Sequence, residues 1–156
     1  MKNIVLIFSI FFILNACEKD EPMENVQNII HISYTNSIGD DLLDENTVNH
    51  IDPSNIDIYY LSEGAKIRVY DENMDLPESF KIYFNQTYNK YFLQIQLSHF
   101  VIDNLSETYI HINEDVDTIK CEYEIIDNGY SFQKVWYNSI LKINSDNWIE
   151  FIEITK

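Results

Sequence analysis

One thiol and many carboxylates are the side chains of this chain best suited to nucleophilic or acid–base chemistry. Cys121 lies in a run, 119–125, in which apolar side chains alternate with charged ones. A reactive thiolate needs a cationic and partly exposed setting, whereas this alternation places Cys121 on the same face as Ile119 and Tyr123. The pattern therefore predicts a small buried core residue rather than a nucleophile.

The four histidines are spread along the chain and form no His-x-His or His-x-x-x-His pair. They are His31, His50, His99 and His111. Such spacing gives no zinc signature. His31 and His111 fall on polar positions of alternating segments, where a solvated side chain is expected.

One acidic segment resembles the start of a calcium-binding loop. Asp71, Asn73 and Asp75 match its first three ligand positions, but Leu76 and Ile82 replace the glycine and the glutamate that the loop requires. Residues 40–45 hold four carboxylates without diagnostic spacing. We therefore expect a polar turn at Asp71, and neither a metal nor another cofactor.

No other segment carries a known catalytic pattern. The sequence has no glycine-rich phosphate loop, no Gly-x-Ser-x-Gly elbow and no His-Glu-x-x-His motif. With 26 acidic residues, paired carboxylates arise by chance. No catalytic residue is assigned.

Aromatic side chains are the feature that best suits binding, since the chain has 11 Tyr, 9 Phe and 2 Trp. Adjacent residues of a strand face opposite ways, so one of Tyr59/Tyr60 and one of Trp136/Tyr137 must point away from the core. Exposed Tyr and Trp form platforms for sugars or proteins. Tyr59 and Trp136 are therefore candidate binding residues. The alternative is that they only cover the outer face of a sheet in cross-strand pairs.

The elements that position these side chains are predicted to be strands. Alanine occurs only twice, while β-branched and aromatic residues abound. Segments with a period of two are separated by turn residues such as Glu63-Gly64 and Asn138-Ser139. The expected strands are 29–36, 56–62, 65–70, 80–85, 91–97, 108–113, 118–126, 131–137, 140–144 and 148–154.

These strands predict an all-β chain with a single antiparallel β-sandwich, Ig-like or transthyretin-like, with a partly open β-barrel as the alternative. Inward positions include Ile67 and Phe84, and the core is expected to contain Ile30, Ile58, Ile82, Ile95, Ile119 and Tyr123. Two stretches remain open. Residues 40–46 form either a helical turn or an irregular loop, and residues 98–106 form either a short helix or a buried connection.

The first 16 residues are typical of an export signal. Lys2 precedes an apolar run of 11 residues, Ile4–Leu14, which is shorter than the roughly 20 residues of a membrane-spanning helix. The residues Leu14-Asn15-Ala16-Cys17 resemble a bacterial lipobox, which implies cleavage before Cys17 and a diacylglycerol on its thiol. An ordinary signal peptide and a retained short anchor are the alternatives.

The residues after Cys17 extend this resemblance. Glu18-Lys19-Asp20-Glu21 is similar to the Lys/acidic export tag of the Bacteroidota, which implies the outer face of the outer membrane. Short stretches, 39–43, 117–119 and 134–138, also resemble small uncharacterised surface lipoproteins of that phylum. The resemblance implies a surface lipoprotein with a β-rich fold and supplies no catalytic residue. The expected organisation is a signal peptide at 1–16, an acidic tether at 17–27 and a β-sandwich domain at 28–156.

The net charge of the chain limits which classes of partner it can bind. Removal of residues 1–16 takes away one of 10 basic side chains and none of 26 acidic ones, so the net charge changes from −16 to −17. Binding of phosphates requires Lys and Arg, so nucleic acid is excluded as a partner. We expect a lipid-anchored, non-enzymatic module that binds a glycan or protein. A small extracytoplasmic hydrolase or a purely structural surface protein is the alternative.

Overall fold

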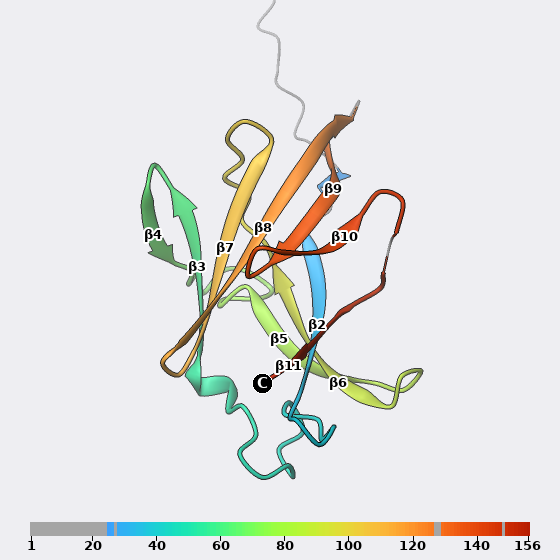
Figure 1. The fold of residues 1–156 in the computed structure, drawn as a ribbon. Coiled ribbons are helices and arrows are strands. Elements are labelled where there is room, and N and C mark those ends of the chain that lie inside the picture. Colours follow the sequence, from blue (N-terminus) through green and yellow to red (C-terminus); the bar gives the residue numbers. More distant parts are fainter. Residues whose placement is uncertain (1–24, 27, 127–128, 148) are drawn as a thin grey trace, which may run out of the picture.

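Eleven strands and one 3-10 turn make up the described part of the chain, which comprises residues 25–26, 28–126, 129–147 and 149–156 of a computed structural model (Figure 1). The elements are β1 (Asn25–Val26), β2 (Ile29–Thr35), η1 (Pro53–Asn55), β3 (Ile56–Ser62), β4 (Ala65–Arg68), β5 (Phe80–Asn85), β6 (Lys90–Gln96), β7 (Leu105–Ile112), β8 (Asp115–Ile126), β9 (Gly129–Tyr137), β10 (Ile140–Asn144) and β11 (Ile152–Thr155).

The strands form two sheets that do not close into a barrel. The large sheet has the order β1-β9-β8-β7-β3-β4, and β10 pairs with β9 along the edge that β1 also uses. The small sheet has the order β11-β2-β6-β5. The predicted all-β sandwich is therefore confirmed, and the partly open barrel is wrong. Most pairs are antiparallel, but β1 with β9 and β11 with β2 are parallel.

The core lies between the two sheets. Ile32, Leu93 and Ile95 of the small sheet and Ile110 and Ile119 of the large sheet are fully buried. The burial follows the period of two that the sequence shows, as in β7, where every second side chain is buried. Five of the six predicted core residues are buried, and Ile82 is partly buried against the core.

A buried polar network joins the sheets at one end of the sandwich. Tyr34 of β2 and Tyr137 of β9 share a hydrogen bond of 3.0 Å between their hydroxyls. Asp117 accepts a hydrogen bond from Asn138 Nδ2 at 2.7 Å and pairs with Lys156 Nζ at 2.7 Å. Burial opposes the charge of Asp117, but the bonds from Lys156, Tyr137 and Asn138 outweigh it and hold the pKa of this carboxyl below its usual value.

Two of the predicted turns have the backbone geometry of tight hairpins. Asn138 and Ser139 both have positive φ, 48° and 68°, as do Glu63 and Gly64, 50° and 81°. Positive φ at both central residues is the mark of a type I′ turn, whose twist matches that of the strands it joins. The serine at position 139 thus occupies the place where glycine is usually found.

Three apolar side chains near the edges of the sandwich are exposed, and two of them, Ile67 and Phe84, are predicted above to face inward. Ile67 lies opposite Tyr60 and therefore on the inner face, yet it is half exposed because the four-stranded sheet is narrower than the large one. Phe84 and Ile125 lie at strand ends beyond the core and are also exposed. The predicted burial of Ile67 and Phe84 is wrong for this reason.

The two open stretches are connections without an α-helix. Residues 40–46 form irregular turns, in which Asp41 Oδ1 accepts the N–H of Leu43 and Asp41 Oδ2 accepts that of Tyr91. Residues 98–104 connect β6 to β7, and Ile102 pairs with Leu105 across the turn.

Part of the predicted organisation lies outside the described residues. The export signal, Cys17 and Trp148 belong to it. The large sheet includes Asn25 and Val26, two residues that the sequence assigned to the tether. Within the described residues, no helix has the length and apolar character needed to cross a membrane.

Candidate binding site

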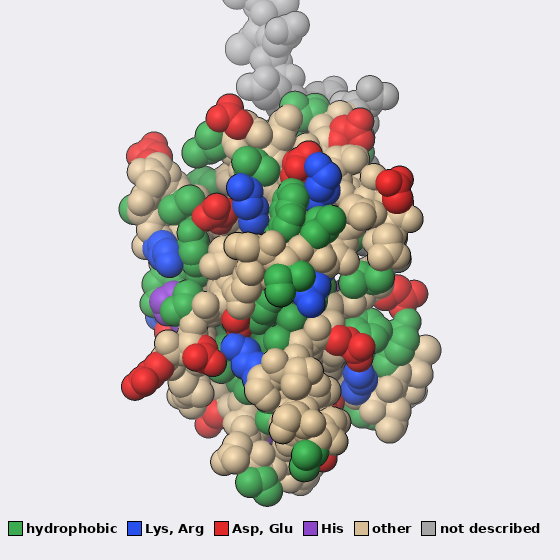
Figure 2. All heavy atoms as spheres, in the orientation of Figure 1, with side chains coloured by type: hydrophobic (Ala, Val, Ile, Leu, Met, Phe, Trp, Pro, Cys, Tyr) green, Lys and Arg blue, Asp and Glu red, His purple; other side chains and the backbone are tan. Residues whose placement is uncertain are grey.

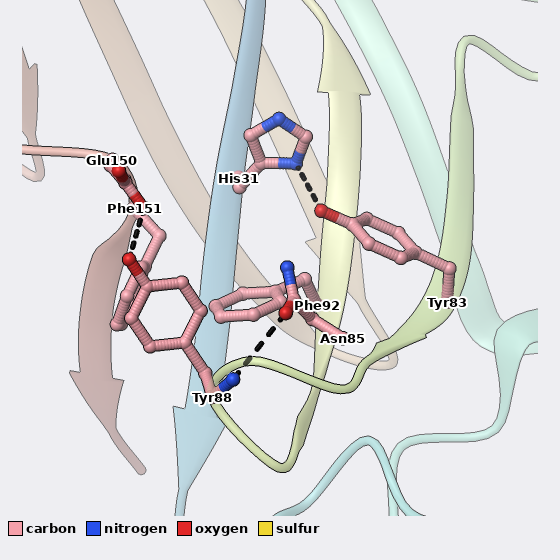
Figure 3. A pocket seen from close by; sticks show the side chains of 7 residues that line it. All are labelled: His31, Tyr83, Asn85, Tyr88, Phe92, Glu150 and Phe151. Carbon is pink, nitrogen blue, oxygen red and sulfur yellow. Dashed lines mark hydrogen bonds between the residues drawn. The ribbon is translucent and has the colours of Figure 1, made fainter.

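An aromatic pocket opens on the outer face of the small sheet, on the side away from the core (Figure 3). It has a volume of about 320 Å³, at the lower end of the range of small-ligand sites. The small-sheet pocket, as we call it, is lined by His31, Tyr83, Asn85, Tyr88, Phe92, Glu150 and Phe151. Aromatic rings thus meet a few polar groups, which is the usual composition of such sites.

Phe92 forms the floor of the small-sheet pocket. It lies on the outer face of β6, yet only 1% of it is exposed. Its ring centroid lies 4.7 Å from that of Phe151, 5.9 Å from that of Tyr88 and 6.0 Å from that of Tyr83. These tilted and edge-to-face contacts are the favoured geometries of aromatic pairs. Phe92 is therefore the centre of a second apolar cluster outside the sandwich.

The turn between β5 and β6 holds Tyr88 at the rim. Asn85 Oδ1 accepts the backbone N–H groups of Thr87 and Tyr88, which closes the turn in the manner typical of Asn. Asn89 then adopts a positive φ of 51° and leads into β6. Tyr88 is 39% exposed and donates its hydroxyl hydrogen to Glu150. This bond raises the pKa of Tyr88.

The opposite wall comes from the end of the chain. β11 runs parallel to β2, with Ile152 opposite Ile32, and this pairing places Phe151 beside His31 and Phe92. Lys90 Nζ pairs with Glu153 at 2.7 Å and lies 5.6 Å from the centre of the Phe151 ring. The wall is therefore fixed by a strand pair and by an ion pair.

His31 and Tyr83 supply polar groups on the third side. Tyr83 Oη lies 3.1 Å from His31 Nδ1, and the rings meet edge to face. Burial, with the charge of Lys81 adding to it, lowers the pKa of His31. This shift favours the neutral imidazole near pH 7, and a hydrogen bond joins its Nδ1 to the Tyr83 hydroxyl.

A second hollow continues from the small-sheet pocket. It has a volume of about 430 Å³ and shares Tyr88, Glu150 and Phe151 with the pocket, while Lys142 and Ile149 extend it toward β10. The two hollows therefore adjoin one another at the segment that leads into β11. Together they offer more room than one small ring requires.

Trp136 lies on the other outer face, that of the large sheet, as predicted. Its hollow of about 520 Å³ is lined by Leu105, Glu107, Thr118, Lys120, Glu122, Trp136 and Ser139. Glu107, Lys120 and Trp136 are direct neighbours across β7, β8 and β9. The carboxylates are already engaged, since Glu107 accepts from Tyr109 Oη at 2.6 Å and Glu122 pairs with Lys134 at 3.0 Å.

Tyr59 also points outward, while Tyr60 is buried. The centre of the Tyr59 ring lies 4.3 Å from the centre of the His111 ring on the neighbouring strand, β7. Tyr59 and Trp136 are separated by two intervening strands, about 14 Å at the usual strand spacing. The structure therefore does not bring these two candidates together into one platform.

The remaining residues considered for catalysis or metal binding lie in surroundings that indicate a structural role. Cys121 is 1% exposed, and burial raises the pKa of its thiol to about 12, so no substrate in solution reaches a thiolate there. Asp71 Oδ1 accepts from the backbone N–H and the side-chain amide of Asn73, as in an ordinary polar turn. Among the described residues, no three His, Cys, Asp or Glu side chains are grouped closely enough to hold a metal ion.

Sequence reasoning missed the small-sheet pocket. His31 was expected to be solvated, and Phe92, Glu150 and Phe151 were not singled out. One signal was present, because Phe92 and Leu93 are adjacent and both apolar, which indicates a strand covered on both faces. The partner of Phe92 could not be identified, since Phe151 lies far along the chain.

Comparison with known proteins yields no relative. No protein-family model, no curated protein and no solved structure matches this chain.

Proposed function

We propose that this protein is a lipid-anchored surface module that binds a glycan, without enzymatic activity, in the small-sheet pocket. The observation that carries this proposal is the pocket itself, in which three aromatic rings surround a buried phenylalanine beside a few polar groups. The C–H faces of sugar rings pack on aromatic side chains, and their hydroxyls pair with groups such as Asn85 and Glu150.

The shape of the site favours a chain of sugars over a single one. The two hollows that share Tyr88, Glu150 and Phe151 follow one another over the surface. A ligand of two or more rings can therefore place one ring against Tyr88 and the next beside Lys142. The strongly acidic chain, with a net charge of −16, favours neutral glycans over anionic ones.

Support for the anchor comes from the sequence. The apolar run ending in Leu14-Asn15-Ala16-Cys17 and the following acidic residues with Lys19 resemble lipoprotein processing and export signals. Two or three acyl chains hold a protein firmly at a membrane, whereas one chain does so only marginally. The proposed location is the outer membrane, with the domain at the cell surface.

The anchor is tested by metabolic labelling with a fatty-acid analogue. Wild-type protein should take up the label, and the Cys17→Ala variant should not. Equal labelling of the two would contradict lipid attachment at Cys17.

The glycan proposal is tested on a glycan array with the mature chain in mild detergent. Tyr88→Ala removes a wall of the pocket and should weaken binding at least tenfold, about 1.4 kcal/mol. Tyr88→Phe keeps the ring and removes only the bond to Glu150, so it should retain most of the affinity. Trp136→Ala is the matched control on the other face and should bind as the wild type does.

Other outcomes point elsewhere. Loss of binding in Trp136→Ala but not in Tyr88→Ala would transfer the site to the large sheet. Hydrolysis of a bound glycan would place the protein among the hydrolases. If no glycan binds, the glycan proposal is wrong.

A further inference from the structure

Three exposed apolar side chains lie at the end of the sandwich where the chain enters it. Their exposed fractions are 62% for Ile102, 66% for Ile125 and 44% for Ile126. The connection of residues 98–104 and the end of β8 are neighbours, since the N–H of Tyr123 donates to the carbonyl of Asn104 at 2.8 Å. We call these three residues the entry tip; the connection and the end of β8 lie at the top of Figure 1.

The entry of the chain is fixed at this tip by strand pairing. Asn25 of β1 lies opposite Gly129, and Gly129 in turn lies opposite Ile126. β2 also starts here, because Leu97 donates its N–H to the carbonyl of Asn28. The opposite end of β2 leads into the loop that carries Ile38, which lies at the bottom of Figure 1.

The length of chain before β1 limits where a membrane can lie. Asn25 is eight residues after Cys17, a stretch of chain that reaches at most about 28 Å when fully extended. The 12 residues of β8 alone span about 40 Å. An anchor on Cys17 therefore keeps the entry tip close to the bilayer and leaves the loop of Ile38 remote from it.

We infer that the entry tip rests on the surface of the membrane, with Ile102, Ile125 and Ile126 in contact with a neutral phospholipid layer; this inference rests on the proposed lipid anchor. Exposed apolar groups of this kind insert into the boundary between headgroups and acyl chains. The charged neighbours Asp103 and Glu124 are acidic, which disfavours an anionic surface.

This orientation has a consequence for the small-sheet pocket. The turn between β5 and β6, which carries Tyr88, lies at the end of β6 opposite to Gln96, and Gln96 pairs with Ile29 near the entry tip. The rim of the pocket is thus turned away from the membrane and toward the surroundings of the cell.

The experiment uses single cysteines as reporters on the mature lipidated chain. The variants Ile102→Cys, Ile125→Cys and, as control, Ile38→Cys are labelled with an environment-sensitive maleimide dye. Ile38 is equally apolar and 82% exposed. The buried thiol of Cys121 does not compete for the dye, because its pKa is raised to about 12.

The labelled proteins are reconstituted into vesicles of phosphatidylcholine and phosphatidylethanolamine that contain a quencher-bearing lipid. We expect severalfold stronger quenching at positions 102 and 125 than at position 38. Equal quenching at all three positions in protein that floats with the vesicles would overturn the inference and leave the anchor intact. Protein whose mass shows no lipid and which does not float would overturn both.

Discussion

The two sheets of the sandwich use their outer faces in different ways. On the large sheet, Trp136 lies in a row with Lys120 and Glu107, and all of these side chains come from strands that are paired with one another. Lys and Arg side chains are interspersed with acidic and apolar ones on the face of the molecule seen in Figure 2. On the small sheet, Phe92 is covered by Phe151 and Tyr88, which lie outside the strands that flank it.

Both faces carry a hollow, and the difference shows how one of them acquires a buried aromatic floor. Side chains that are only cross-strand neighbours contact one another in pairs along the sheet. Their charged groups form ion pairs and hydrogen bonds with one another. A wall that stands above the sheet requires chain from elsewhere, here the β5–β6 turn and the segment before β11. The small sheet has both, and its outer face therefore holds a pocket with a dry aromatic floor.

The largest expected effect follows from the burial of Phe92. Phe92→Ala should lower the free energy of unfolding by about 3 to 5 kcal/mol, as for a core phenylalanine. Trp136→Ala, which truncates a larger but partly exposed side chain, should cost only about 1 kcal/mol. Urea unfolding of both variants measures the two losses. Similar losses would remove the distinction between the two faces.

The next largest loss of stability is expected for the buried polar network between the sheets, which belongs to neither outer face. Asp117→Asn removes the charged partner of Lys156 and should cost about 2 to 3 kcal/mol near neutral pH. Because the folded pKa of Asp117 lies below its unfolded value, its stabilisation is present above about pH 4 and is lost as the pH falls through the folded pKa. The variant should therefore approach the wild type in stability in acid. A constant difference down to pH 2 would contradict this account.

A smaller effect is expected in mild acid, where stability should fall because of His31 on the small-sheet face. The folded pKa of His31 lies below 6.5, so the unfolded chain binds its proton first. The wild type should lose stability as the pH falls from about 6.5 through the folded pKa of His31. His31→Gln should show a weaker loss over this range, whereas Trp136→Ala should keep the wild-type slope. Parallel pH profiles of wild type and His31→Gln would show that His31 titrates as it does in the unfolded chain.

The smallest effect is expected for the ion pair beside Trp136. Lys134 and Glu122 are both substantially exposed, so Lys134→Met should change stability by less than about 0.5 kcal/mol. Salt should reduce even this difference. A loss above about 1.5 kcal/mol would show that the large-sheet face is more tightly organised than its contacts indicate.

The strands themselves could be predicted from the sequence, whereas the pocket could not. Alternation of apolar and polar residues located all ten of the longer strands, and the Asn138-Ser139 turn marked the last hairpin correctly. Alternation is a local property and is decided by which face of a strand is buried. It also gave the outward direction of Trp136 and Tyr59.

What failed were features that depend on the width of the sheets and on distant pairing. Ile67 faces inward but finds no cover, because the opposing sheet ends before β4. Phe92 faces outward but is buried, because β11 pairs in parallel with β2 and brings Phe151 to it. Neither the extent of a sheet nor a parallel pairing over more than 100 residues leaves a local signal in the sequence.

The central claim, that the small-sheet pocket binds a sugar, is tested most directly by amide chemical shifts of the mature chain. Methyl glycosides of the common hexoses and N-acetylhexosamines are titrated as probes, and the resonances of both outer faces are followed together. The account predicts saturable shifts at Asn85, Tyr88 and Phe151, with the signals around Trp136 unchanged. Shifts centred on Trp136, or no saturable shift with any of these probes, would contradict it.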